Sequence, residues 1–230
     1  DGGLTWSPVL THESPGAPLP VQTGQVKLTI SATAPPVVFA SVLDGADSHE
    51  DGGLFRSGDG GLTWEKRSVH PQMCPKAGFN QCGYDHTLLV HPTKPDTVYL
   101  GTVSFYGSTD GGATWGTFVN VYAPGAEIHP DQHALAIPAT EPGTLWIGND
   151  GGLYKSTDGG ATFENRSDTL GLIQFNGVAL HPSMPGFLMG GTQDNGNLRT
   201  LDATGWSDRT GSDGGFVLVR QDAPAQVLAP

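Results

Sequence analysis

The chain has 230 residues, of which 34 are glycine and 18 proline, and only 15% are charged. This composition favours many short strands joined by turns, and therefore an all-β fold. The formal net charge is −12, and the 11 basic residues form no dense patch, which argues against nucleic acid or an anionic membrane surface as a partner. No apolar run approaches the roughly 20 residues that span a bilayer, so we expect no direct membrane insertion.

A short motif recurs along the chain, starting at its first residue. It reads Asp-Gly-Gly-Leu-Thr-Trp or a close variant, and a worn copy ends at Trp206. Its aromatic positions are 58, 51, 48 and 43 residues apart, a period that matches one four-stranded propeller blade. The four clear copies begin at Asp1, Asp59, Asp110 and Asp158 and end at Trp6, Trp64, Trp115 and Phe163. Because the chain begins inside this motif, we expect it to be a processed or truncated segment whose leader, if any, lies outside it.

Two strands are expected between successive motifs. A first, innermost strand follows a polar turn, as in 83–92, 130–138, 173–182 and 212–220. A second apolar run follows a turn that contains proline, at 37–42, 97–102, 144–149, 187–192 and 226–229. The sequence therefore predicts a single β-propeller domain over 1–230, or a fragment of one, with about four to five blades visible from a larger ring. The predicted blades are 22–68, 82–120, 131–167 and 174–210, with a partial blade at 1–10 and 213–230.

The motif itself is predicted to be structural. Its aspartate can accept backbone N–H groups of its own turn, its glycines allow positive φ, and its aromatic residue can pack between blades. The turn would join the two outer strands of each blade, on the face opposite to the turns that precede the first strands. The candidate site therefore belongs to the face formed by the turns that precede the first strands, and we call this face the mouth.

Polar residues gather at the predicted mouth. Carboxylates, imidazoles and amides there can bind sugar hydroxyls, a cation or a peptide, or can simply hydrogen-bond one another around a water-filled channel. The catalytic candidates are Asp85, Asp131, Asp150 and Asp213. The ligand-binding candidates are Tyr84, His86, His129, His133, Gln174, Gln193, Asp194 and Asn195, and the loop with Asp47, His49 and Glu50 lies beside them.

Metal binding and a disulfide are two further possibilities. His129, Asp131 and His133 would point the same way from an extended strand and could offer three ligands, although a structural network of these side chains is favoured. Cys74 and Cys82 bracket a short loop, which predicts a disulfide and an oxidising compartment. A rival interpretation joins both cysteines to His70 and His86 as zinc ligands. No cofactor is expected, with Ca²⁺ or Zn²⁺ as an alternative.

The Ser-x-Asp-Gly-Gly-x-Thr-aromatic pattern, complete from Ser57, Ser108 and Ser156, resembles the Asp-box of bacterial neuraminidase repeats. The stretch from Gly83 to Gly215 resembles a family of bacterial exported propellers with such repeats, through His129–Leu135, Gly148–Tyr154 and Gly191–Gly196. It is more distantly similar to sortilin-type, xyloglucan-hydrolysing and photosystem II assembly propellers. The resemblance implies a bacterial protein that is periplasmic, secreted or held at the cell surface.

Three functions remain open. The favoured one is a binding or assembly module for an extracellular glycan or protein partner. An inverting glycoside hydrolase needs two carboxyl groups roughly 6.5–9.5 Å apart, which the mouth aspartates could supply. The third is a subunit held by its blade edges in a larger complex, where its acidity would favour a basic partner. A sialidase is not expected, because no arginine lies in the turns before the first strands, where such an enzyme clamps its substrate carboxylate.

Overall fold

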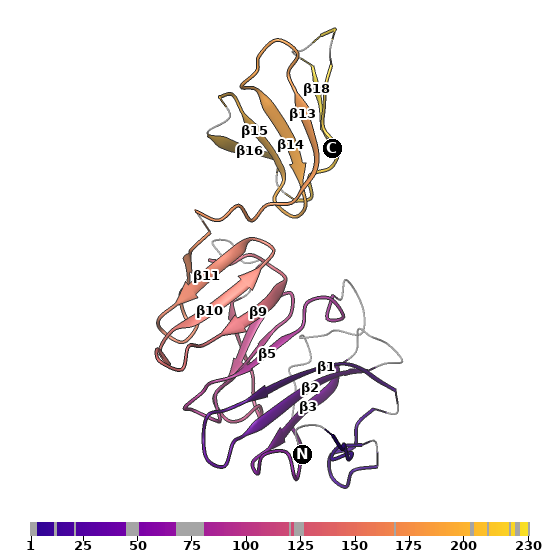
Figure 1. Cartoon of the computed structure of the whole chain (residues 1–230), viewed down its shortest axis with the longest axis vertical. Coiled ribbons are helices and arrows are strands. Elements are labelled where there is room, and N and C mark those ends of the chain that lie inside the picture. The colour runs from indigo at the N-terminus through magenta and orange to yellow at the C-terminus, as the bar shows by residue number, and fades with distance from the viewer. Residues whose placement is uncertain are drawn as a thin grey trace. The chain divides into compact units, whose positions relative to one another are not determined.

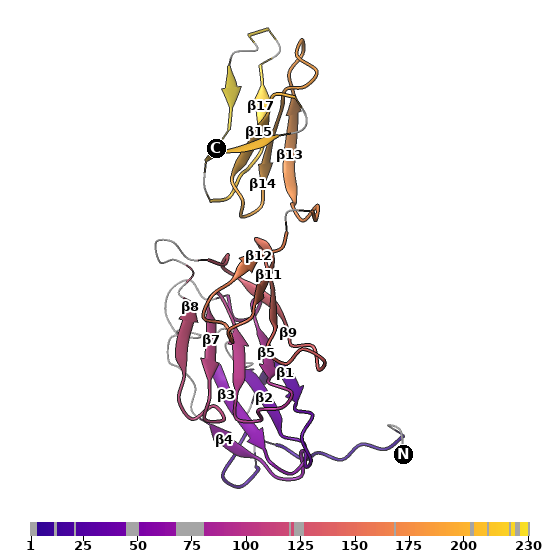
Figure 2. The same ribbon diagram turned by 90° about the vertical axis from the view of Figure 1, so that its left-hand side faces the viewer.

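The computed structural model describes residues 4–11, 13–20, 22–44, 51–67, 81–119, 121, 127–167, 169–202, 205–210, 212–220, 222–223 and 226–229. The chain divides into two compact units, residues 1–166 and 167–230, which are described separately below as unit 1 and unit 2. All regular elements of the described residues are β-strands (Figures 1 and 2). No described helix is long and apolar enough to cross a membrane.

Unit 1 contains three antiparallel sheets of four strands, each a simple meander in chain order. The first sheet is β1 (Thr23–Ile30), β2 (Val38–Asp44), β3 (Asp51–Ser57) and β4 (Glu65–Arg67). The second is β5 (Thr87–Val90), β6 (Val98–Gly101), β7 (Phe105–Ser108) and β8 (Gly116–Val119). The third is β9 (Gln132–Ala136), β10 (Leu145–Asn149), β11 (Gly152–Ser156) and β12 (Glu164–Asn165).

The cores of unit 1 lie between consecutive sheets. The innermost strand β5 contacts both β1 and β9, so the three sheets stand side by side around their first strands. Phe39 and Leu54 of the first sheet pack with Leu88 and Leu100 of the second, and all four are buried. A second core joins Phe105 of the second sheet to residues of the third, among them Leu145, Ile147 and Tyr154. Burial on both sides explains why β6 is buried at every position.

Unit 2 contains one complete sheet and a two-stranded sheet. The complete sheet is β13 (Phe175–Leu180), β14 (Leu188–Thr192), β15 (Asn197–Thr200) and β16 (Trp206–Thr210). The short sheet is β17 (Leu218–Val219) and β18 (Val227–Leu228), and β17 lies against β13. The segment before β17 also lies close to the complete sheet, because a methyl group on Gly191 of β14 would meet the backbone of Gly215.

The all-β prediction is confirmed, and four-stranded antiparallel sheets packed through their inner strands fit part of a β-propeller. The second strands lie within one residue of their predicted starts, for example β10 at Leu145–Asn149 against 144–149. The recurring motif joins the third and fourth strands in each sheet of unit 1, as expected. The number of blades in the ring stays a prediction, and so does the single propeller domain over residues 1–230.

Candidate functional site

The Ser-x-Asp-Gly-Gly turns form one end of unit 1, and each turn binds its own carboxylate. Asp59 Oδ1 accepts hydrogen bonds from the N–H groups of Leu62 and Thr63 at 3.0 and 2.9 Å, and its Oδ2 accepts from Thr63 Oγ1 at 2.6 Å. The Ser57 hydroxyl donates to Oδ1 at 2.7 Å and accepts from Gly61 N–H at 2.8 Å. The same bonds recur at Asp110 and Asp158.

These bonds saturate the turn carboxylates. The threonine hydroxyl, followed by the backbone N–H groups and the serine, holds the pKa of Asp59, Asp110 and Asp158 well below its usual range. The aromatic residues of the motif stand at the cores: Trp115 packs on the first intersheet core and Phe163 on the second, while Trp64 packs beside Phe55. Asp1 lies outside the described residues. The turns thus hold sheets together rather than offer a binding surface.

The mouth of unit 1 lies at the other end, where β5 and β9 begin and β10 ends. Backbone bonds set its shape: the N–H groups of Tyr84 and Asp85 donate to Gln81 O, both at 2.7 Å. The N–H of Asp131 donates to Val103 O at 3.0 Å, and the N–H of Gln132 to Thr102 O at 2.8 Å. The turn before β9 is therefore fastened to the loop after β6, which brings Asp131 beside Asp85.

Three aspartates and one histidine meet at this mouth. His133 Nε2 lies 2.6 Å from Asp150 Oδ1 and 3.6 Å from Asp85 Oδ1. Gln81 Nε2 donates to Asp131 Oδ1 at 3.1 Å. Asp85 is completely buried and Asp131 is 9% exposed, whereas the side chain of His133 is 33% exposed. The site thus has a buried acidic floor and a histidine–carboxylate pair at the surface.

Burial changes the acidity of this floor. Desolvation raises the pKa of Asp131, and the negative charge of Asp150 acts in the same direction. A hydrogen bond from the carboxyl group of Asp85 and the charges of His129 and His133 oppose this rise. Asp131 therefore resists ionisation more than an exposed aspartate does.

Tyr84 adds an exposed aromatic ring to the site. Its side chain is 69% exposed, and its ring centroid lies 5.0 Å from that of His133 with the planes at 82°. This edge contact leaves aromatic surface open to solvent directly beside the His133–Asp150 pair.

One of the predicted ligand-binding histidines, His86, turns towards the protein. His86 is 3% exposed, with Nε2 at 2.7 Å from Ser41 Oγ and Nδ1 at 3.2 Å from Gln25 Oε1, so neither nitrogen faces the mouth. Burial lowers the pKa of His86 to about 4. His129 directs Nδ1 to Pro130 O at 3.2 Å.

The proposed geometry for a metal site at His129, Asp131 and His133 is wrong. Asp131 has a φ of 67°, and β9 begins only at Gln132, so the three residues are not alternate positions of one extended strand. Across the described part of the chain, no group of three or more His, Cys, Asp or Glu side chains is arranged to hold a metal ion.

Unit 2 brings together the remaining predicted residues. Gln193 Nε2 donates to Asp213 Oδ1 at 2.8 Å and to Asp194 Oδ1 at 3.1 Å, while the N–H of Asp194 also donates to Asp213 Oδ1 at 3.0 Å. The N–H of Gln193 donates to Gln174 O, and Asn195 Nδ2 donates to Gln193 O. This cluster consists of amides and two carboxylates, without the histidine that marks the mouth of unit 1.

Several residues that shape the mouth were missed from the sequence. Gln81 binds Asp131, and Ser41 and Gln25 bind His86. Each of the three lies 45 to 61 positions from its partner in the sequence. Only the position of Gln81 just before a mouth turn hinted at a role. The loop with Asp47, His49 and Glu50 lies outside the described residues, as do His70 and Cys74. The disulfide therefore stays a prediction; its other predicted member, Cys82, is buried.

Comparisons with known proteins come from structure alone, because no protein-family model and no curated protein sequence matches the chain. The GH74 xyloglucanase from Xanthomonas campestris is 17% identical, with a TM-score of 0.45, over 88% of this chain and 34% of that one. The extracellular domain of the putative hybrid two-component system BT4673 from B. thetaiotaomicron is 15% identical, with a TM-score of 0.41. The match covers 94% of this chain and 27% of that one. YCF48, in a structure bound to D1 peptide, is 15% identical, with a TM-score of 0.32. The match covers 100% of this chain and 81% of that one.

The chain spans about a third of the length of the GH74 structures it matches. At identities this low, the likeness concerns the fold and leaves activity open. Function must therefore be argued from the residues of the mouth.

Proposed function

We propose that this chain is a binding module of an exported propeller, and that the mouth of unit 1 binds a glycan. The observation that carries the proposal is the exposed ring of Tyr84 beside the bonded His133–Asp150 pair. Sugar binding needs an apolar surface for the ring face and fixed polar groups for the hydroxyls. Tyr84 supplies the first of these, and Asp150 and His133 supply the second.

The polar groups are ordered before any ligand arrives. Asp150 is bound by His133, and His133 stands over the buried Asp85. Side chains that are already fixed lose little conformational freedom when a ligand binds, which favours affinity. Asp150, whose side chain is 19% exposed, and His133 remain accessible at the surface.

The same geometry weighs against the alternative of an inverting hydrolase. An inverting enzyme keeps substrate and a water molecule between two carboxyl groups. In unit 1 the His133 imidazole fills the space between Asp85 and Asp150, since its Nε2 contacts both. In unit 2 the amide of Gln193 joins Asp194 and Asp213 in the same way. Within each unit the aspartates are thus bonded into a network rather than held apart.

Export and the choice of a glycan over a protein belong to the proposal too. The two cysteines on either side of a short loop support an oxidising compartment. A protein segment with hydroxyl and amide groups is the competing ligand for the mouth. The resemblance to bacterial exported propellers supports a periplasmic, cell-surface or secreted location.

Binding to immobilised glycans, followed by titration calorimetry with the best ligand, tests the proposal. We expect Tyr84→Ala to weaken binding about tenfold or more, because a stacked aromatic ring is lost, while the melting temperature stays unchanged. Phe216→Ala is the matched control, since this phenylalanine of unit 2 is 81% exposed. A protein that binds no glycan, or a Tyr84→Ala variant that binds as well as the parent, would overturn the assignment. Capture of a defined peptide by the same residues would replace the glycan with a protein partner.

A further inference from the structure

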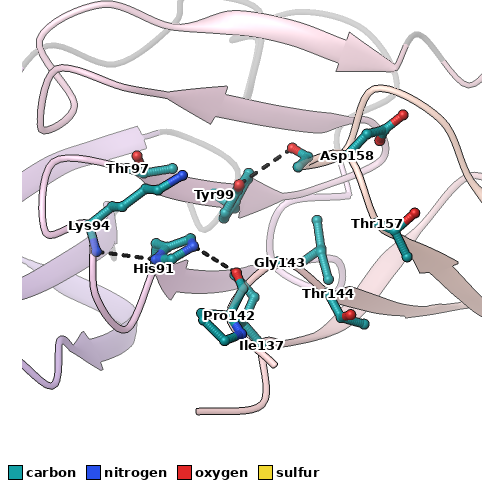
Figure 3. Close-up of a pocket in the computed structure, with 12 residues that line it drawn as sticks. His91, Lys94, Thr97, Tyr99, Ile137, Pro142, Gly143, Thr144, Thr157 and Asp158 are labelled. Atoms are coloured by element: carbon teal, nitrogen blue, oxygen red, sulfur yellow. Dashed lines mark hydrogen bonds between the residues drawn. The ribbon is translucent and has the colours of Figure 1, made fainter. Parts of the chain in front are cut away.

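A pocket of about 220 Å³ lies between the second and third sheets of unit 1, at the end with the Ser-x-Asp-Gly-Gly turns. Figure 3 shows its walls, which include His91, Lys94, Thr97, Tyr99, Thr144 and Thr157. The mouth precedes β5, whereas His91 directly follows β5, so the pocket and the mouth lie at opposite ends of this strand. The pocket is therefore a separate feature of the same unit.

The preceding interface, between the first and second sheets, explains why the pocket exists. There Arg56 of β3 lies over the ring of Phe39 and binds Asp96 of the second sheet, with Nη2 3.0 Å from Oδ1. The strand registers pair Phe39 with Arg56 in the first sheet and Tyr99 with Gly107 in the second. Glycine thus replaces the arginine at the next interface.

The carboxylate of Asp96 likewise has no counterpart at the interface between the second and third sheets. Asp96 precedes Thr97 and Val98 at the start of β6, and Gly143 occupies the same place before Thr144 and Leu145 at the start of β10. A methyl group built on Gly143 meets no atom within 4 Å. Gly143, which lines the pocket, therefore leaves open the place that the Asp96 carboxylate takes at the preceding interface.

Lys94 brings a positive charge to the pocket. Lys94 lines the pocket, and Figure 3 shows its side chain extended along one wall. No ion pair of Lys94 occurs among the residues that the structure describes. The carboxylate of Asp158 also lines the pocket and stays ionised, but its oxygens accept the hydrogen bonds of its own turn, and no ion pair with Lys94 occurs among the described residues.

The other polar groups of the wall act as donors or are occupied. His91 Nδ1 accepts the N–H groups of Thr93 and Lys94 at 3.2 and 3.1 Å, so its Nε2 carries the hydrogen donated to Pro142 O at 2.8 Å. The ring is therefore neutral and fully bonded. Hydroxyl groups of Thr97, Thr144 and Thr157 remain to donate hydrogen bonds to a ligand.

We propose that this pocket binds a small organic carboxylate, whose anionic group pairs with Lys94 and accepts hydrogen bonds from the threonine hydroxyls. The ligand supplies the negative charge that Asp96 supplies between the first two sheets. The volume suits a molecule of the size of one monosaccharide or a short dicarboxylic acid. Lys94 is exposed, so its ammonium group is accessible to a ligand, and its pairing with a carboxylate is a charge-assisted hydrogen bond.

Titration calorimetry with D-glucuronate, succinate and neutral D-glucose tests the proposal and separates a sugar acid from an aliphatic one. We expect at least one acid to bind, D-glucose to bind at least about tenfold more weakly, and added salt to weaken binding of the acid. Lys94→Met should lower the affinity about tenfold or more. Lys155→Met is the matched control, because Lys155 lies over the ring of Trp146, away from the pocket walls.

Gly143→Asp gives a second, independent variant. It places a carboxylate where Asp96 stands at the preceding interface, so it should fill the pocket, pair with Lys94 and abolish binding without loss of thermal stability. Tyr84→Ala should leave binding of the acid unchanged, which separates this site from the mouth. The proposal fails if neither acid binds at millimolar concentration, if D-glucose binds equally well, or if Lys94→Met and Gly143→Asp both bind as the parent does.

Discussion

Asp110 and Asp131 lie at opposite ends of unit 1 and titrate in opposite directions. Asp110 is exposed, yet the Thr114 hydroxyl and backbone N–H groups hold its pKa well below the usual range. Asp131 is nearly buried, and desolvation raises its pKa. The difference shows that the supply of hydrogen-bond donors, and not exposure alone, decides which form of a carboxyl group is stable. One end uses aspartate to stabilise turns, and the other keeps it in an environment where it resists ionisation.

Backbone conformation separates the two ends as well. Glycine takes the positive φ angles of the motif turns, such as 70° at Gly111 and 81° at Gly112. Among the described residues, positive φ outside glycine occurs at Asp131 in the mouth of unit 1, and at Asp194 and Ser212 in unit 2. A side chain in this conformation costs roughly 1–2 kcal/mol. The turn before β9 therefore keeps an aspartate where glycine would be easier to accommodate, which supports a role for the mouth of unit 1 beyond stability.

The largest expected effect on stability comes from Gly112→Ala, at the end of unit 1 that carries the Ser-x-Asp-Gly-Gly turns. Gly112 has positive φ, and a methyl group there would collide with Leu54 of the neighbouring sheet. We expect a loss of roughly 2–5 kcal/mol in the free energy of unfolding, from strain and overpacking together. Gly143→Ala is the control, with an expected change within about 0.5 kcal/mol. Equal denaturant midpoints for the two variants would mean that the turn does not pack between the sheets.

A pH titration of stability tests burial near the mouth. The pKa of His86 is about 4 in the folded protein, below its ordinary 6.5, because the ring is buried. Protonation therefore favours the unfolded chain: the stability is present above pH 6.5 and is lost as the pH falls towards 4, by about 3 kcal/mol. His86→Gln should flatten this dependence, measured by denaturation at several pH values. His181→Gln in unit 2 should keep the parent's slope, and a flat parent curve would contradict the burial of His86.

Ser108→Ala tests how much the serine of a Ser-x-Asp-Gly-Gly turn contributes to stability. The Ser108 hydroxyl accepts the N–H of Gly112 at 2.9 Å and donates to Asp110 at 2.8 Å, and both Ser108 and Gly112 are buried. Its loss leaves a buried N–H without this acceptor, so we expect about 1–3 kcal/mol of destabilisation in chemical denaturation. Thr109→Ala changes the exposed neighbour and should have almost no effect. If both variants unfold alike, the serine is not part of what stabilises the turn.

Much of the fold was predictable because it repeats. Asp59, Asp110 and Asp158 recur at blade spacing within nearly identical neighbours, so one local explanation serves three turns. The apolar runs at 97–102 and 144–149 likewise predicted strands buried on both sides; β6 is buried at every position, whereas β10 is buried only at Leu145 and Ile147.

The mouth was predictable only as a group of residues. That Tyr84, Asp85, Asp131, His133 and Asp150 share one end followed from the order of strands. Their pairing did not, because it depends on the left-handed backbone at Asp131 and on the bonds from its turn to the loop after β6. The burial of His86 was equally hidden, since its partners Ser41 and Gln25 both lie in the first sheet, far from His86 in the sequence. The pocket lies at Gly143, which is informative only once its place before β10 is compared with that of Asp96 before β6.

The smallest effect comes from one substitution made at both ends, Asp110→Asn and Asp131→Asn. At pH 7 the first should lower the melting temperature by roughly 2–4 °C, because the threonine and N–H donors favour the charged form. The second should leave the melting temperature unchanged or raise it, because it removes a charge from a site that disfavours ionisation. Asparagine also tolerates the positive φ of Asp131, so the backbone is not the cause of any difference.

The pH dependence of these two differences gives the decisive check. The lowered pKa of Asp110 contributes stability above its ordinary value of 3.8, and this contribution fades as the pH falls below that value. The parent should therefore lose its advantage over Asp110→Asn in acid. The raised pKa of Asp131 acts in reverse: its stabilising contribution is present below 3.8 and is lost as the pH rises through the folded pKa. Parent and Asp131→Asn should thus diverge in the parent's favour on acidification, and parallel curves for both variants would mean that the two ends do not treat aspartate differently.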